Sequence, residues 1–360
     1  APVPYPPVLH SLASASTITW LIHQKFELSI PLYRQEKEWE ALGLRLSRAT
    51  MSNWLLVVYR DWLAHIVHRL KLELLKQRYL HIDETHVQVL KEPGRKNTSD
   101  SYMWVYCSIR DAVNPIRYFE YQPGRSGKYP EAFLREYEGY IHTDAYSGYN
   151  AVSGVKRCLC YTHLRRAFVD ALPKDIHNSE ASKPAEAILR LNQLFNIESE
   201  LEALPPDQKK KERLIREKPL LEAFWSWAEK SAIGELPKSK LSKAFHYALN
   251  NREGFWNYLE DGNCSISNSL AENCIRPFVI GRKNWLFSDT PAGAKASAVI
   301  YSIVETAKAN NLKPYDYFEY LLSEIPNHMD DKDLSFLEDL LPWSEKLPDH
   351  CRKPKPASKR

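Results

Sequence analysis

The stretch that most constrains the fold is YLHIDETHVQVL, residues 79–90, which has the texture of a buried β-strand but carries two acids and two histidines. Burying a charge without a partner is costly, so such a strand needs specific partners elsewhere in the chain. Successive side chains of a strand point to opposite faces, so Asp83 shares a face with His81 while Glu84 lies on the other. The strand therefore offers two adjacent carboxylates that point in opposite directions.

Segments rich in β-branched and aromatic residues continue from this strand. RYLHIDETHVQVL, SYMWVYCSIR and PIRYFEYQ are separated by the turn-like KEPGRKNTSD and DAVN, which predicts a three-stranded meander. Next we expect a short helix in SGKYPEAFLREY, a strand in GYIHTD, a short helix in SGYNAV, a strand in KRCLCY and a helix in THLRRAFVDAL. The order β-β-β-α-β-α-β-α predicts an α/β fold, with helices on the faces of a mixed sheet.

The segments on either side of this core are predicted to be helical. The N-terminal part contains two helical patterns around GLRL, which fit either a helix-turn-helix or plain helical packing. A long stretch with apolar residues at three- and four-residue spacing predicts an all-helical insertion, after which NSLAENCIRPFVIG predicts a short helix and PAGAKASAVIYSIVETAKAN a final one. The basic, proline-rich RKPKPASKR at the end is typical of disorder. The predicted parts are a helical region 1–77, a core 78–175, an insertion 176–261, the end of the core 262–324 and a tail 325–360.

Composition excludes several classes of protein. With 44% hydrophobic and 26% charged residues the chain is an ordinary globular one, and its longest apolar runs are far shorter than the roughly 20 residues that cross a bilayer. No basic-then-apolar leader pattern is visible, so we expect a cytoplasmic protein. The six cysteines are scattered, without a Cys-x-x-Cys pair, which favours reduced thiols over disulfides or a zinc finger. A net charge of +4 permits a nucleic-acid partner through local patches.

Two further carboxylates complete a candidate site. Asp144 ends the apolar strand in YIHTDAYSGYN, and it faces Asp83 if the fourth strand lies beside the first. Two close carboxylates repel unless a cation sits between them, and hard divalent ions favour such oxygen ligands. Glu272 lies on the short predicted helix, with Arg276 one turn later and Arg282, Lys283 and Trp285 beyond. The alternative for Asp83 and Asp144 is that they are ordinary aspartates in turns at strand ends. The alternative for the Glu272 segment is a surface helix with an ion pair between Glu272 and Arg276 and with Trp285 in the core.

Five blocks in this order resemble the catalytic region of the insertion sequence 66 family of bacterial transposases: HIDET, HTDAYSGYN, CYTHLRRAF, AENCIRPFVIGRKNWLF and GAKASAVIYSIVETAKANNLKPYDYFEYLL. The family belongs to the DDE transposases, and the resemblance implies a ribonuclease H-like mixed sheet flanked by helices. It assigns a metal-binding catalytic triad to Asp83, Asp144 and Glu272, which would hold Mg²⁺ or Mn²⁺, with two ions expected. Cys160 and His163 of CYTH resemble a Cys-x-x-His motif, and we expect them to order the active site, unless they are a core cysteine and a helix-capping histidine.

The function that the resemblance implies is metal-dependent 3′-end cleavage and strand transfer of an insertion sequence. Expected partners are transposon ends, target DNA, further copies of the chain and accessory proteins of the element, in the bacterial cytoplasm and at the nucleoid when DNA is bound. The resemblance implies that full-length members carry a coiled-coil segment and a Cys-rich zinc-binding module before this region. Neither is visible in this sequence, so we expect the chain to lack them. A structure-specific nuclease and a decayed, non-catalytic DNA-binding relative are the alternatives. The expected DNA-contacting residues are Arg165, Arg166, Arg276, Arg282, Lys283 and Trp285.

Overall fold

The structure, a computed structural model, describes residues 5–173, 182–328, 331 and 333–354. The basic end of the predicted tail, residues 355–360, lies outside this range. The chain divides into two compact units. The first unit comprises residues 1–77, 83–126 and 271–360, and the second comprises residues 78–82 and 127–270.

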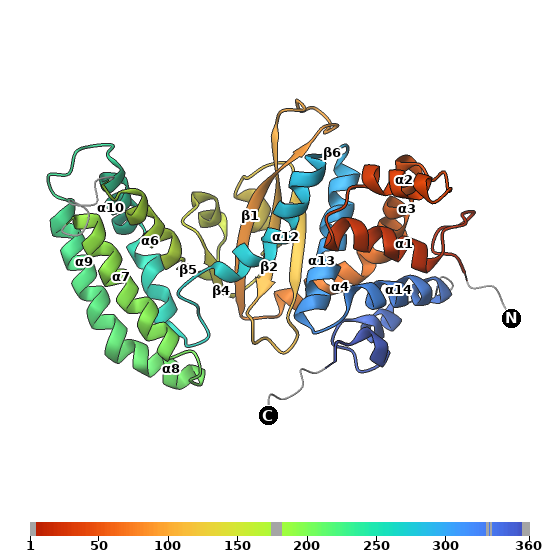
Figure 1. The fold of residues 1–360 in the computed structure, drawn as a ribbon. Helices are drawn as coiled ribbons and strands as arrows, with labels where there is room; N and C mark the ends of the chain where they lie inside the picture. The colour runs from red at the N-terminus through yellow and green to blue at the C-terminus, as the bar shows by residue number, and fades with distance from the viewer. Residues whose placement is uncertain (1–4, 174–181, 329–330, 332, 355–360) are drawn as a thin grey trace. The chain divides into compact units, whose positions relative to one another are not determined.

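The described strands form a six-stranded mixed sheet with the order β3-β2-β1-β4-β5 and with β6 beside β1 (Figure 1). Strands β2 and β3 are antiparallel, whereas β4 is parallel to both β1 and β5, and β6 is parallel to β1. The predicted α/β class is confirmed, and the strand order is that of a ribonuclease H-like sheet. The two-residue β6 is the one strand that the sequence did not predict, because it is too short to have a period. The strands are β1 (Tyr79–Val89), β2 (Asp100–Ser108), β3 (Arg117–Gln122), β4 (Gly139–Thr143), β5 (Val155–Leu159) and β6 (Phe287–Ser288).

In the first unit, helix α13 packs along β3. Hydroxyl groups of α13 accept hydrogen bonds from backbone N–H groups of β3, as a further strand would do. The backbone N–H groups of Arg117 and Phe119 donate to Thr306 Oγ1 (3.0 Å) and Ser302 Oγ (2.8 Å). Buried hydroxyls thus satisfy backbone donors that the sheet leaves unpaired. The helices of this unit are α1 (Ala15–Ile22), α2 (Leu32–Ala41), α3 (Arg48–Val58), α4 (Ala64–Leu75), α12 (Ser269–Trp285, apart from its first two residues), α13 (Pro291–Ala309) and α14 (Pro314–Glu324).

Short helical segments complete the first unit. The π-helical turns η1 (His23–Glu27) and η2 (Tyr59–Leu63) continue α1 and α3, and 3₁₀ turns lie at Ile325–His328, Ser335–Leu340 and Asp349–Cys351. The region predicted as a tail therefore has local structure where it is described.

Helix α12 is longer than the short helix expected from the sequence. It runs for 17 residues and contains Pro277, although proline removes a helical hydrogen bond. Buried residues on both sides of the proline, among them Cys274, Ile275 and Phe278, hold the helix against the core of the first unit. Their burial explains why the helix continues through a residue that usually ends one.

The second unit combines β4 and β5 with a helical bundle. Helices α6, α7, α9 and α10 lie side by side and bury aromatic rings, including Phe168, Phe224, Trp225 and Phe245 (Figure 1). The insertion is helical where it is described, as predicted. Its elements and those that precede it are α5 (Lys128–Phe133), η3 (Ser147–Ala151), α6 (Tyr161–Asp170), α7 (Lys183–Glu200), α8 (Pro206–Glu212), η5 (Arg213–Glu217), α9 (Lys218–Ala232), α10 (Lys240–Asn250), α11 (Arg252–Trp256) and η6 (Asn257–Glu260).

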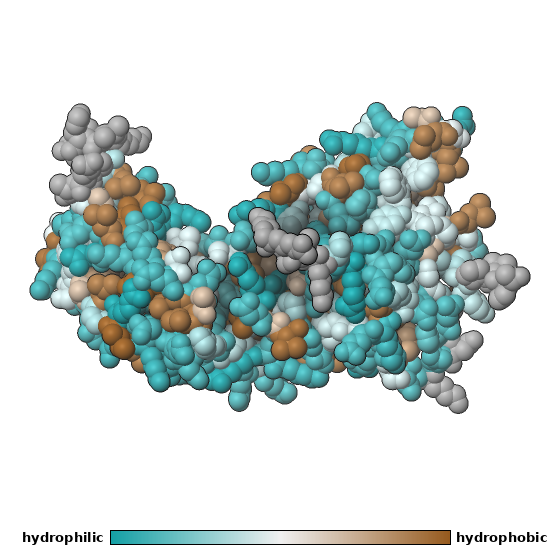
Figure 2. Space-filling view, turned by 60° about the horizontal axis from the view of Figure 1, so that its bottom comes forward, coloured by the Kyte–Doolittle hydropathy of each residue, from teal (hydrophilic) through white to brown (hydrophobic). Residues whose placement is uncertain are grey.

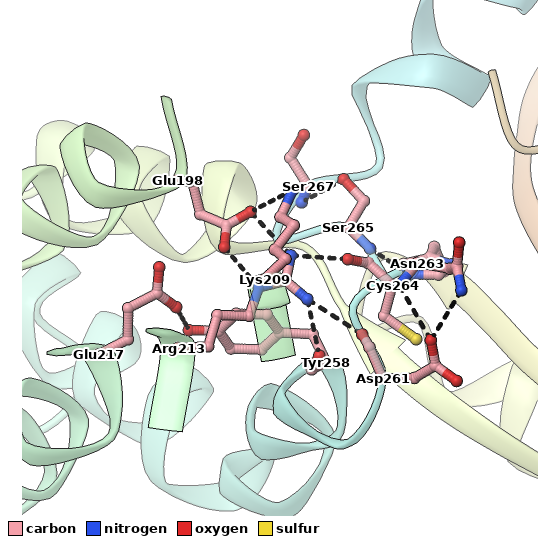
Figure 3. A network of polar contacts seen from close by, with 11 residues as sticks. Glu198, Lys209, Arg213, Glu217, Tyr258, Asp261, Asn263, Cys264, Ser265 and Ser267 are labelled. Carbon is pink, nitrogen blue, oxygen red and sulfur yellow. Dashed lines mark hydrogen bonds and ion pairs between the residues drawn. The ribbon is translucent and has the colours of Figure 1, made fainter. Parts of the chain in front are cut away.

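A fully buried arginine, Arg213, fixes the end of the helical insertion (Figure 3). Its guanidinium donates to both carboxylate oxygens of Glu198, at 2.6 and 2.8 Å. It also donates to the backbone carbonyls of Tyr258, Asp261 and Cys264, at 3.1, 3.0 and 2.8 Å. Because a planar guanidinium offers five donors in a fixed fork, one side chain holds the segment that leads into α12.

None of the described helices is both long enough and apolar enough to span a bilayer. On the face seen in Figure 2, hydrophobic residues form small separate groups within a mostly hydrophilic surface.

Candidate active site

Asp144 begins the turn that follows β4 in the second unit. Its Oδ1 accepts a hydrogen bond from the backbone N–H of Tyr146 at 2.9 Å, which closes the turn. Arg157 on β5 holds the same turn, donating to the carbonyl oxygens of Asp144 (2.6 Å) and Tyr146 (2.8 Å) and to Thr143 Oγ1 (2.7 Å). The backbone around Asp144 is therefore fixed by a side chain that the sequence analysis did not single out.

Gly148 explains the SGY part of the motif. A Cβ atom at this position would overlap the ring of Tyr146, so a larger residue would displace that ring. Tyr149 next to it is buried and lies under the guanidinium of Arg157, 5.2 Å from its ring centre. Residues 147–149 of the motif HTDAYSGYN therefore shape a well-packed turn after β4.

Asp83 lies on β1 in the first unit and is half-buried. Its Oδ1 accepts a hydrogen bond from the backbone N–H of Glu84 at 2.9 Å. The neighbouring Glu84 carboxylate forms an ion pair with Arg125, whose Nε and Nη2 lie 2.7 and 2.6 Å from Glu84 Oε1. His86 pairs with Asp100 at 2.8 Å. The Glu84 carboxylate is thus held by the guanidinium of Arg125.

Glu272 lies in the first turn of α12, and other residues of this helix connect it to β1 within the first unit. Arg282 Nη1 donates to Thr85 Oγ1 at 3.2 Å, two residues beyond Asp83. Burial and a hydrogen bond to Cys274 raise the pKa of Cys107, and the charge of Asp83 contributes to this rise. Cys274 follows Glu272 by two residues, so Asp83 and the first part of α12 both lie near one buried pair of thiols.

A buried amide, Asn268, lies in the second unit directly before α12. Its Nδ2 donates to the carbonyl of Ile82 (2.8 Å) and its Oδ1 is 3.0 Å from His81 Nδ1. Its backbone N–H donates to Cys160 Sγ at 3.1 Å. Ile82 precedes Asp83 in the chain, and Ser269 is the first residue of the helix that carries Glu272. One side chain therefore connects the residue before Asp83 with the start of that helix.

The two histidines of neighbouring strands lie beneath this amide. His81 stacks on His142 with ring centres 4.2 Å apart and planes 11° apart. Both rings are buried, and His81 Nδ1 lies within hydrogen-bond distance of Asn268 Oδ1. Cys160 is the residue before α6, and the half-buried His163 lies in the first turn of that helix.

The basic residues expected to contact DNA differ in their exposure. Arg276 and Lys283 on α12 and Arg166 on α6 are exposed, whereas burial lowers the pKa of Arg282. Arg165 Nε donates to Asn192 Oδ1 on α7 at 2.8 Å.

Trp285 is half-buried and has two neighbours from the N-terminal region of the first unit. Its ring lies against Phe26, with ring centres 6.5 Å apart, and Lys25 Nζ is 5.3 Å from its centre. Burial lowers the pKa of Lys25 to about 8. The Trp285 ring thus has packing partners within the first unit and stays partly exposed.

Asp83 and Glu272 thus belong to the first unit, and Asp144, Cys160 and His163 to the second. Two residues that hold the site in place, Asn268 and Arg157, were not identified from the sequence. Both are polar residues whose importance depends on partners far away in the chain.

Comparisons with known proteins identify the family. Residues 10–296 match the model described as the transposase IS66 family, and residues 302–343 match the IS66 C-terminal element. Similar relatives are three uncharacterized proteins of Sinorhizobium fredii. They are y4hP (26% identical over 96% of this chain), y4qI (27% over 93%) and y4jD (25% over 96%).

The chain spans 64%, 63% and 69% of the lengths of these three relatives. No solved structure matches. The family model covers most of the chain. The chain is therefore a member of the IS66 family of transposases.

Proposed function

We propose that this chain is the catalytic part of a DNA transposase, with Asp83, Asp144 and Glu272 as its catalytic carboxylates. The observation that carries the proposal is the parallel register of β1 and β4, in which His81 pairs with His142. Asp83 and Asp144 each follow that pair by two residues in the same chain direction. The register ends at this pair, and Asp144 begins the turn after β4, so the register supports the proposal through the chain direction and the spacing that the two aspartates share.

The second support is the contact between Asn268 and Ile82. It ties the start of α12 to the residue before Asp83, which favours a position for Glu272 on the same side of the sheet. We propose Cys160 as a positioning residue, since its Sγ accepts the backbone N–H of Asn268. His163, one turn into α6, is proposed to act with it.

The three proposed ligands are all carboxylates, the oxygen donors that Mg²⁺ and Mn²⁺ prefer. They are half-buried, so each can reach solvent and a bound substrate. When bound, such ions lower the pKa of a water molecule and neutralise charge that develops on a phosphate. The donor set therefore fits a pair of divalent ions, with the three carboxylates as the protein ligands.

The proposed reaction consists of two in-line displacements at phosphorus. In the first, a water oxygen bonds to the phosphorus at the transposon end, and the bond to the 3′ oxygen breaks. In the second, the freed 3′ hydroxyl bonds to a phosphorus of target DNA, and a target 3′ oxygen leaves. No covalent link to the protein forms. We propose that Arg165, Arg166, Arg276, Arg282 and Lys283 contact DNA phosphates, and that Trp285 adds a partly exposed ring beside them.

The test replaces each carboxylate singly, as Asp83→Asn, Asp144→Asn and Glu272→Gln. A transposon-end oligonucleotide and a plasmid target, with Mn²⁺ or Mg²⁺, report cleavage and joining separately. Each variant is expected to lose cleavage and joining by about 10³-fold or more, because the charge that holds the cation is gone. DNA affinity is expected to change little. Glu84→Gln, in the adjacent carboxylate, is the matched control and is expected to keep activity.

Strand transfer that persists in any of the three variants rules out that residue as a ligand. Cleavage without joined products in the unmodified chain indicates a nuclease instead. A chain that binds DNA but shows neither reaction, with no effect of the three substitutions on Mn²⁺ binding, indicates a DNA-binding relative that has lost catalysis.

A further inference from the structure

Three side chains of metal-binding type converge in the second unit, although they are far apart in the sequence. His142 lies on β4, Cys158 on β5 and Cys264 in the segment that leads into α12. Their ligand atoms all lie within 4.8 Å of one another, and each residue is only 1% exposed. Such a group of one imidazole and two thiols is distinct in chemistry from the carboxylates of the proposed active site.

The sheet and the buried arginine fix these residues in place. In the parallel register of β4 and β5, His142 is directly paired with Cys158, so their side chains lie on the same face. Arg213 Nη2 donates to the backbone carbonyl of Cys264 at 2.8 Å and holds the third residue (Figure 3). The three elements that supply the ligands are therefore rigid before any ion binds.

The hydrogen bonds of His142 define its tautomer. Nδ1 lies 3.2 Å from the carbonyl oxygen of Leu80, so Nδ1 carries the proton and donates to it. Nε2 then carries a lone pair, which accepts the backbone N–H of Ser265 at 2.9 Å, next to Cys264. A ring N–H that donates to a backbone carbonyl is the usual support of a metal-binding histidine. An ion on Nε2 would replace the hydrogen bond from Ser265 and the contact between His142 and the Cys264 thiol.

We infer that His142, Cys158 and Cys264 form a binding site for a thiophilic divalent ion, with Zn²⁺ as the best match. Zinc accepts one nitrogen and two sulfur ligands in tetrahedral geometry, and a small molecule such as water completes the fourth position. The ion would join β4 and β5 to the segment before α12. Mg²⁺ does not compete for this site, because it prefers oxygen ligands. The inference does not depend on the proposed transposase activity.

The test uses Co²⁺ as a spectroscopic substitute for Zn²⁺, added to the full chain in excess Mg²⁺ to occupy carboxylate sites. We expect one equivalent of Co²⁺ to produce thiolate-to-metal charge-transfer bands, which Zn²⁺ then removes by displacement. Cys158→Ser and Cys264→Ser are each expected to abolish these bands. Cys107→Ser is the matched control, because Cys107 and Cys274 also form a buried thiol pair but have Arg117 beside them, which disfavours a cation.

Absence of thiolate bands in the unmodified chain, or bands that persist in both serine variants, overturns the inference. A measurement without substitutions covers the case in which the variants fail to fold. X-ray absorption of the Zn²⁺-loaded chain is expected to show two sulfur neighbours at about 2.3 Å and nitrogen or oxygen neighbours at about 2.0–2.1 Å. A zinc ion with no sulfur neighbour contradicts the assignment.

Discussion

At the scale of single residues, Asn268 connects more of the candidate site than any residue of the sequence motifs does. Its side chain and backbone bind a carbonyl of β1, a histidine of the same strand and the cysteine of CYTH. It carries no charge and no reactive group, so it positions others. Two polar residues of the strand 79–90 also have structural partners. Glu84 forms an ion pair with Arg125, and His81 forms a hydrogen bond with Asn268.

The substitution Asn268→Ala is expected to slow DNA cleavage while DNA affinity stays nearly constant. It leaves the Ile82 carbonyl and a ring nitrogen of His81 without their partner, which costs about 1–3 kcal/mol of stability. A small displacement of α12 relative to β1 is expected to lower the cleavage rate by about 10- to 100-fold.

Single-turnover cleavage and a DNA-binding titration separate the two effects. Asn263→Ala, in the same segment, is the control with little expected change in rate, since Asn263 bonds Tyr79 and Asp261 instead. Equal rates for the two variants contradict the positioning role of Asn268.

At the scale of elements, α12 is held by close packing within the first unit. A Cβ atom at Gly281 would overlap the ring of Trp285 and lie 2.6 Å from the hydroxyl of Tyr301, which is fully buried. Gly281→Ala is therefore expected to destabilise the chain by about 1–3 kcal/mol, even though alanine favours a helix.

Gly293→Ala in α13 is the matched control for this prediction. Its nearest contact would be Thr290 Oγ1 at an ordinary 3.6 Å, so this helical glycine is expected to accept alanine without loss of stability. Thermal denaturation followed by circular dichroism measures both variants. A Gly281→Ala variant as stable as Gly293→Ala shows that the Trp285 ring moves aside at little cost.

At the scale of the whole molecule, the network around Arg213 predicts how stability depends on pH. Burial, with the charge of Glu198, raises the pKa of Glu217 to about 8 from an ordinary value of 4.5. Between these values the folded chain holds a proton that the unfolded chain has lost. The contribution of Glu217 to stability is thus fully present below about pH 4.5 and is lost as the pH rises through about 8.

Glu217→Gln removes this titration. The unmodified chain loses stability as the pH rises and the variant does not lose it at this position. The difference in melting temperature, variant minus unmodified chain, is therefore expected to increase from about pH 5 to about pH 9. Each kcal/mol corresponds to a shift of roughly 2–4 °C. Glu200→Gln, in an exposed ion pair with Arg216, is expected to show a constant difference. A constant difference for Glu217→Gln as well contradicts the raised pKa.

The net charge of the molecule is only +4, so the proposed DNA binding relies on local groups of basic residues. Arg276→Ala and Lys283→Ala are each expected to reduce the slope of log affinity against log salt by about 0.9. Lys346→Ala, in an ion pair with Asp339, is the control and is expected to leave the slope unchanged. DNA binding measured at several salt concentrations tests this, and unchanged slopes for both α12 variants exclude phosphate contacts there.

The elements were predictable to the extent that they have a local pattern. The meander, the alternating helices and strands and the helical insertion all follow from periodicity, and the structure confirms them. Helix α12 was predicted too short, since a proline is read as a helix end and the burial that carries the helix through Pro277 is tertiary. Asp83 and Asp144 were identifiable as candidates because a carboxylate within or directly after an apolar strand is unusual, and Glu272 because it belongs to a block that resembles the family.

The sequence by itself determined the kinds of elements, their order and which residues carry useful chemistry, because these depend on neighbours a few positions apart. The tertiary structure alone decided which distant groups meet. It joined Asn268 to Ile82 across 186 positions and brought Cys264 to His142 and Cys158. A buried polar group must find its partner wherever packing brings one, and no local pattern encodes that choice.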